Sequence, residues 1–76
     1  MDVQQRIIKI LSQQVNLEEY LIKLSTKFTD LGMDSLVVLE FVIVVEEEFD
    51  ITLDEIEIHN LNNVAELVDF VERKLG

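Results

Sequence analysis

The stretch SLVVLEFVIVVEEEF, residues 35–49, is the clearest indication of the fold in this sequence. It contains no proline or glycine, and in the whole chain of 76 residues proline is absent and glycine occurs only twice, which removes most of the turns that hairpins need. At about 100° per residue in a helix, Val38, Val42, Val45 and Phe49 lie on one side. The stretch therefore predicts a helix from about 35 to 49 with these four residues in the core.

Apolar residues three and four positions apart indicate further helices on both sides of this stretch. We expect the first at about 2–15 and the last at about 63–75, with a short helix at about 54–59 between. Asn63 and Glu66 have the spacing of a capping box at the start of the last helix. The apolar stripes are Val3, Ile7, Ile10 and Leu11 in the first helix, and Val64, Leu67, Val68 and Val71 in the last.

Residues 16–33 lack this periodicity and are expected to form a long, partly ordered loop, in which Gly32 permits a turn. The predicted fold is all-α: a small helical bundle of three main helices plus one short helix, with a long first loop, in a single domain of residues 1–76. The apolar residues expected to hold the loop on the core are Tyr20, Leu21, Leu24, Phe28 and Leu31.

The composition excludes several classes of function. Cysteine is absent and His59 is the only histidine, so neither a disulfide framework nor a zinc site is expected, and His59 is interpreted as a surface residue. No nucleophile and base stand in a recognisable motif, which argues against an enzyme. The chain has no run of about 20 apolar residues that would span a membrane. A cytoplasmic protein is expected.

The distribution of charge indicates the kind of partner. The formal net charge is −10, and residues 28–72 contain 13 acidic residues and no lysine or arginine. Such a field repels nucleic acid and attracts proteins with basic patches. In the helix at 35–49, glutamates lie opposite the core among apolar residues that the core does not need, so this side is expected to bind partners. Its residues are Leu36, Val37, Glu40, Ile43, Val44, Glu47 and Glu48.

The segment DLGMDSL, residues 30–36, places a serine directly after a glycine turn and at the start of the predicted helix. The hydroxyl of Ser35 should be exposed, and the unpaired N–H groups of a helix start favour a phosphate attached there. Asp34 and Ser35 are also common capping residues, so local chemistry alone does not separate a modification site from a helix cap.

This segment resembles the signature of the acyl carrier protein family, and the resemblance extends over the acidic run at 46–51 and over residues 64–71. It implies that Ser35, flanked by Asp34, receives a 4′-phosphopantetheine arm from coenzyme A through a phosphopantetheinyl transferase. The arm would hold acyl intermediates as thioesters for acyl-loading, condensing and modifying enzymes of fatty-acid, polyketide or related biosynthesis. The resemblance is to the free-standing type, expected to be monomeric, and implies no catalysis by the chain itself.

Two positions depart from the family pattern. Val37 stands where many fatty-acid carriers have an acidic residue, and Asp54 stands where proline is frequent, which leaves a specialised polyketide or similar pathway open. Two alternatives also stay open: a carrier of aminoacyl or peptidyl groups on the same serine, and an unmodified acidic module that binds proteins through the helix at 35–49.

Overall fold

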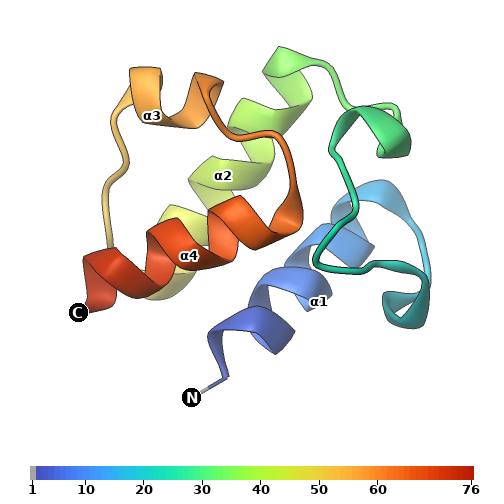
Figure 1. Ribbon diagram of the computed structural model, residues 1–76, viewed down its shortest axis with the longest axis horizontal. Helices are drawn as coiled ribbons and strands as arrows, with labels where there is room; N and C mark the ends of the chain where they lie inside the picture. Colours follow the sequence, from blue (N-terminus) through green and yellow to red (C-terminus); the bar gives the residue numbers. More distant parts are fainter. Residues whose placement is uncertain (1) are drawn as a thin grey trace.

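The computed structural model describes residues 2–76, which form an all-α bundle (Figure 1). The expected three longer helices and one short helix are confirmed. Three of the predicted ranges begin one residue early, because they included the capping residue. Over the described residues, no helix combines the length and apolarity needed to cross a membrane. The helices are α1 (Val3–Val15), α2 (Ser35–Phe49), α3 (Glu55–His59) and α4 (Val64–Leu75), with one-turn 3₁₀ helices η1 (Glu19–Leu21) and η2 (Thr29–Leu31) between α1 and α2.

The core lies where α1 packs against both α2 and α4. The apolar stripe of α4 is buried as predicted, and in α1 Ile7 and Leu11 are buried while Val3 and Ile10 are partly buried. The predicted core side of α2 is also buried. Phe41 joins it, although the sequence argument did not include this residue. The buried residues of α2 are Val38, Phe41, Val42, Val45 and Phe49.

Each α-helix is preceded by a residue whose side chain accepts a hydrogen bond from the backbone N–H three residues on. At α4 the Asn63 side chain accepts from the Glu66 N–H at 2.9 Å, as predicted. A capping box would also have the Glu66 carboxylate accept from the N–H of Asn63. It accepts instead from the N–H of Asn62 at 2.7 Å, so this half of the prediction is wrong. The complete capping box is at α3, between Asp54 and Glu57.

The segment between α1 and α2 is held to the start of α4 by its backbone. Phe28 N–H donates to the Asn62 carbonyl at 3.0 Å, and the N–H of Val64 donates to the Thr26 carbonyl at 3.1 Å. A third bond joins Ala65 N–H to the Leu24 carbonyl at 2.9 Å. Because these bonds give backbone groups of the loop fixed partners, the long loop follows a defined path without a regular element over most of its length.

The side chains that hold this loop are only partly those expected. Phe28 is buried and its ring lies 6.1 Å from that of Phe41, measured between centroids. Leu31 is half-buried, as expected, and Ile22 and Met33 are buried as well. The expectation for three residues was wrong, because the path set by the backbone bonds turns their side chains to solvent. These are Tyr20, Leu21 and Leu24.

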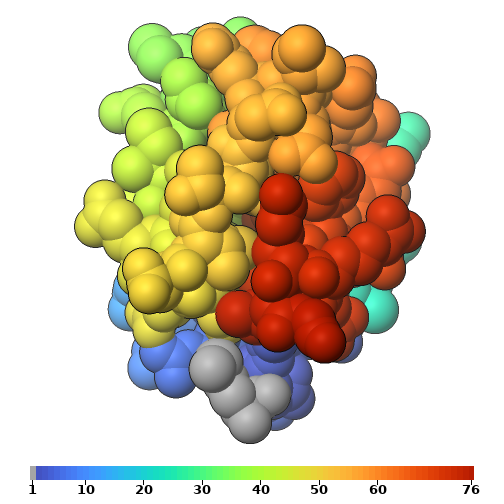
Figure 2. All heavy atoms as spheres, turned by 90° about the vertical axis from the view of Figure 1, so that its left-hand side faces the viewer, coloured from blue at the N-terminus to red at the C-terminus, as the bar shows by residue number. Residues whose placement is uncertain are grey.

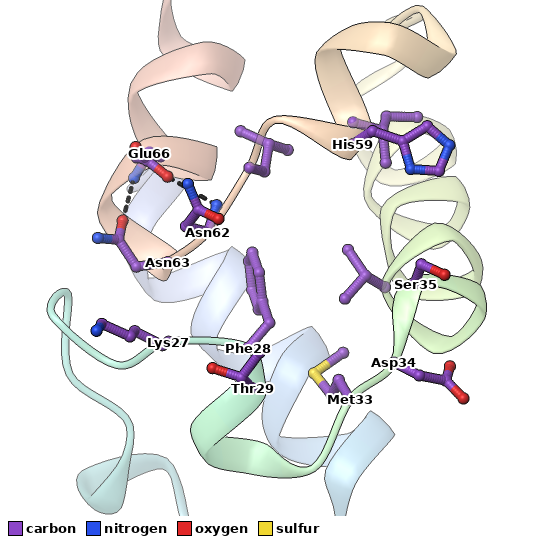
Figure 3. Close-up of a pocket in the computed structure, with 13 residues that line it drawn as sticks. Lys27, Phe28, Thr29, Met33, Asp34, Ser35, His59, Asn62, Asn63 and Glu66 are labelled. Atoms are coloured by element: carbon purple, nitrogen blue, oxygen red, sulfur yellow. Dashed lines mark hydrogen bonds between the residues drawn. The ribbon is translucent and has the colours of Figure 1, made fainter.

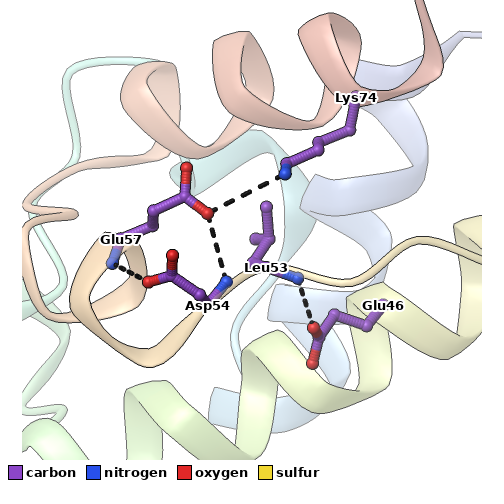
Figure 4. A network of polar contacts seen from close by, with 5 residues as sticks. All are labelled: Glu46, Leu53, Asp54, Glu57 and Lys74. Atoms are coloured by element: carbon purple, nitrogen blue, oxygen red, sulfur yellow. Dashed lines mark hydrogen bonds and ion pairs between the residues drawn. The ribbon is translucent and has the colours of Figure 1, made fainter.

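Polar contacts fix α3 between α2 and α4 (Figure 4). The Glu46 carboxylate of α2 accepts from the N–H of Leu53 at 2.6 Å. Glu57 accepts from the Asp54 N–H at 3.1 Å and lies 3.9 Å from the Lys74 ammonium of α4. This network fixes the start of α3, a helix too short to be stable alone, against the last turns of α2 and α4.

Candidate functional site

Ser35 is the first residue of α2 and is exposed. The Asp34 side chain accepts from the N–H of Val37 at 2.9 Å, and the Asp34 carbonyl accepts from the N–H of Val38 at 3.0 Å. Gly32, with φ of 71°, makes the turn that leads into this cap, a conformation that a residue with a Cβ atom adopts at a cost. Ser35 thus lies where the sequence predicted it, and Asp34 acts through the helix cap.

A cleft of about 590 Å³ opens beside Ser35 and separates the start of α2 from α3 and the start of α4. Figure 3 shows Ser35, Asp34 and His59 at one end of it and Lys27 and Asn63 at the other. Its inner surface is apolar and its rim is polar, which suits a molecule with a hydrophobic part. The buried apolar residues that line it are Phe28, Met33, Val38, Ile58 and Leu61.

The serine hydroxyl and its surroundings fit a phosphopantetheine arm. Ser35 is exposed at a helix start, so its hydroxyl is accessible and a phosphodiester placed there would meet the positive end of the helix dipole. The cleft offers the flexible arm an apolar surface directly beside its attachment point. The hydroxyl, the helix start and the cleft therefore fit the phosphopantetheine arm that the resemblance implied.

The outer side of α2 is both acidic and apolar. The exposed fractions are 64% for Leu36 and 44% for both Ile43 and Val44, although large apolar side chains are usually buried. Glu40 and Glu47 are exposed among them, and within residues 2–76 neither takes part in an ion pair. We call the surface formed by Leu36, Glu40, Ile43, Val44 and Glu47 the outer face of α2.

Two residues that were grouped with this face lie differently in the structure. Val37 is only half-buried, so it contributes a fraction of its surface. Glu48 forms an ion pair with Arg6 of α1. The reason is the turn of about 100° per residue, which directs Glu48 towards the α1 side when Glu47 points to solvent.

No residue of α3 was expected to be an exposed apolar contact, yet α3 carries the most exposed large apolar residue of the described chain. Ile56 of α3 is 74% exposed, whereas Ile58, two residues later, is buried. A separation of two residues is about 200° in a helix, so a pattern of two isoleucines at this spacing in a short helix could have indicated one exposed side chain. Figure 2 shows that α2 and α3 are both visible on one face of the molecule.

The comparisons with known proteins agree with this geometry. A family model described as "Phosphopantetheine attachment site" matches residues 5–71. The chain is 34% identical over 74 residues to an acyl carrier protein of Buchnera aphidicola, covering 96% of this chain and 92% of that protein. It is 33% identical over 76 residues to an acyl carrier protein of Cyanidium caldarium, covering 99% and 88%.

Solved structures show the same fold. An acyl carrier protein from Thermotoga maritima superposes with a TM-score of 0.81 at 28% identity, covering 93% of this chain and 84% of that one. The HMG-ACPI domain of a CurA module from Lyngbya majuscula superposes with a TM-score of 0.83 at 25% identity, covering 96% and 74%. The chain belongs to the acyl carrier protein family, and residues 5–71 match its phosphopantetheine attachment domain.

Proposed function

We propose that Ser35 is the residue that receives the 4′-phosphopantetheine arm from coenzyme A, and that the thiol at the end of the arm carries acyl groups as thioesters. The observation that carries this proposal is the exposed hydroxyl of Ser35 on the first turn of α2, between the Asp34 cap and the apolar cleft. The chain itself performs no catalysis, and as a monomeric domain of the cytoplasm it presents its cargo to other enzymes.

Attachment is tested by intact mass after incubation with coenzyme A and a phosphopantetheinyl transferase of broad specificity. The wild-type protein should gain the mass of one arm, and Ser35→Ala should gain none. Ser25→Ala is the matched control, since Ser25 is an exposed serine of the loop before α2 and its loss should leave the mass gain unchanged. Retention of the mass gain by Ser35→Ala would overturn the assignment.

The partners proposed for the outer face of α2 are the transferase and the acyl-loading, condensing and modifying enzymes of fatty-acid, polyketide or related biosynthesis. Exposed leucine, isoleucine and valine beside unpaired glutamates fit a partner that offers an apolar pocket ringed by lysine and arginine. The absence of lysine and arginine from residues 28–72 supports partners with basic docking patches and argues against nucleic acid.

A carrier of aminoacyl or peptidyl groups would use the same serine, and incubation of the arm-bearing protein with loading enzymes of each class separates the two. Asp54, where proline is frequent in the family, caps α3 here through its hydrogen bond from Glu57 N–H at 3.1 Å. This departure is therefore compatible with the family fold, since a helix start accepts either a side-chain cap or proline.

A further inference from the structure

His59 shares one end of the cleft with Ser35. It is the last residue of α3, its side chain is exposed, and both residues line the same cleft. Figure 3 shows the imidazole on the α3 side of the cleft mouth and the serine on the α2 side, with Lys27 at the opposite end. The fold thus brings a histidine to the mouth from 24 residues further along the chain.

The distribution of charge along the chain makes His59 the candidate cation beside Ser35. Residues 28–72 contain no lysine or arginine, so His59 is the only side chain of that stretch that can carry a positive charge. The linkage of a phosphopantetheine arm to serine is a phosphodiester, which is an anion at every physiological pH. Without a cation nearby, such a group beside Asp34 would meet only repulsion from side chains at this end of the cleft.

We propose that protonated His59 pairs with the phosphodiester of the arm on Ser35 and holds the first part of the arm over the cleft. This inference rests on the proposed attachment at Ser35. His59 acts as a positioning residue, because it directs where the arm lies and takes no part in bond formation. The paired arm passes along the apolar inner surface of the cleft, which shelters the part of the arm and cargo that follows the phosphate.

The charged groups around the imidazole permit this role. On α3 itself the Glu55 carboxylate lies 3.9 Å from the His59 Nε2, and its side chain is 75% exposed, so water screens this contact. Asp34 from the start of α2 and Glu66 from α4 also line the cleft. Lys27 lines its far end, where it cannot replace His59 beside Ser35.

The expected strength is that of one partly exposed charge pair, worth about a two- to fivefold change in the fraction of protein whose arm is docked. Phosphorus NMR relaxation of the arm-bearing protein measures this fraction, because a docked phosphodiester tumbles with the protein and a free one moves faster. The measurement is made at about pH 5.5 and about pH 8.5, because histidine is the type of side chain whose charge changes within this range.

At the lower pH, wild type should show about two- to fivefold more docked arm than His59→Gln. At the higher pH, wild type should fall to the level of that variant, whereas His59→Lys should keep the arm docked at both. Asn60→Gln is the matched control, since it changes the next exposed residue and should behave as wild type.

Two failures can be told apart. Absence of the mass gain in the attachment experiment overturns the proposed function and this inference with it. A normal mass gain with equal phosphorus relaxation in wild type and His59→Gln at the lower pH overturns the inference alone. Docking in wild type that does not change with pH would also overturn it, because an uncharged imidazole would then be responsible. Thermal melts of each variant check that the fold is retained.

Discussion

Helices α2 and α4 each bury one apolar side in the same core, yet their solvent-facing sides differ. In α4 the apolar residues Val64, Leu67, Val68 and Val71 are buried, and the solvent side is polar apart from Leu75 at its end. In α2 five apolar residues are buried, and three more remain exposed. An apolar residue on the solvent side of a helix adds nothing to the core, so the difference supports the docking role proposed for the outer face of α2 and offers no such support for α4.

The ion pairs of the two helices also differ. On α4 Asp69 pairs with Arg73 at 2.5 Å, and Lys74 lies 3.9 Å from Glu57 of α3. The glutamates on the outer face of α2 have no such cation within residues 2–76. One acidic group of α4 is thus paired within its own helix, whereas Glu40 and Glu47 remain available for the basic partner proposed above.

The largest expected effect is on the free energy of unfolding, and it distinguishes a leucine of α4 from a leucine of α2. Leu67→Ala in α4 should lower the free energy of unfolding by about 2 to 5 kcal/mol, because it removes a fully buried side chain and leaves a cavity. Leu36→Ala in α2 should change it by less than about 0.5 kcal/mol. Denaturant or thermal unfolding of both variants makes the test, and equal destabilisation would show that the outer face of α2 is covered in solution.

The next effect concerns binding. Ile43→Ala should speed release of a bound phosphopantetheinyl transferase about five- to thirtyfold, the change expected from losing an apolar anchor worth about 1 to 2 kcal/mol. Leu75→Ala in α4 is matched to it, since both side chains are 44% exposed, and should leave release unchanged. Stopped-flow kinetics measures both. A strongly destabilised Ile43→Ala with normal release would contradict the docking role.

Removal of the side chains that cap α2 and α4 should have a smaller effect on the free energy of unfolding. Asp34→Ala and Asn63→Ala each remove a side chain that accepts from the N–H three residues on, at 2.9 Å in both cases. Each should lower the free energy of unfolding by about 1 kcal/mol. Only Asp34→Ala should also slow the transfer of the arm, measured as the rate of mass gain under conditions where both variants are folded. Equal transfer rates would limit Asp34 to a structural cap.

The smallest effect is electrostatic. Glu47→Lys on α2 and Glu72→Lys on α4 change the net charge by the same amount, and both positions are exposed. Only the first should slow association with the transferase, by a few-fold at low ionic strength, and added salt should bring wild type towards the variant. Equal slowing by both substitutions would mean that net charge alone, rather than the outer face of α2, attracts the partner.

Much of the fold follows from local pattern. Residues 35–49 form a helix over the predicted range because apolar side chains recur at helical spacing and no glycine or proline interrupts them. Asp34 caps it because a short carboxylate directly before a helix reaches a free N–H. These are interactions between residues three or four positions apart, which a sequence displays directly. The exposure of Ser35 could be predicted in the same way, because it follows from the position of this residue at the start of the helix.

Other features depend on residues far apart in the chain, which no periodicity reveals. The path of residues 16–33 is set by backbone bonds to the start of α4, and these bonds leave Tyr20 71% exposed while burying Ile22. Glu48 turns to Arg6 only because α1 packs beside α2. The approach of His59 to the mouth of the Ser35 cleft likewise requires that α3 be packed against α2. Spacing along one helix determines which of its sides is apolar, whereas the packing of neighbouring elements decides what each side chain meets.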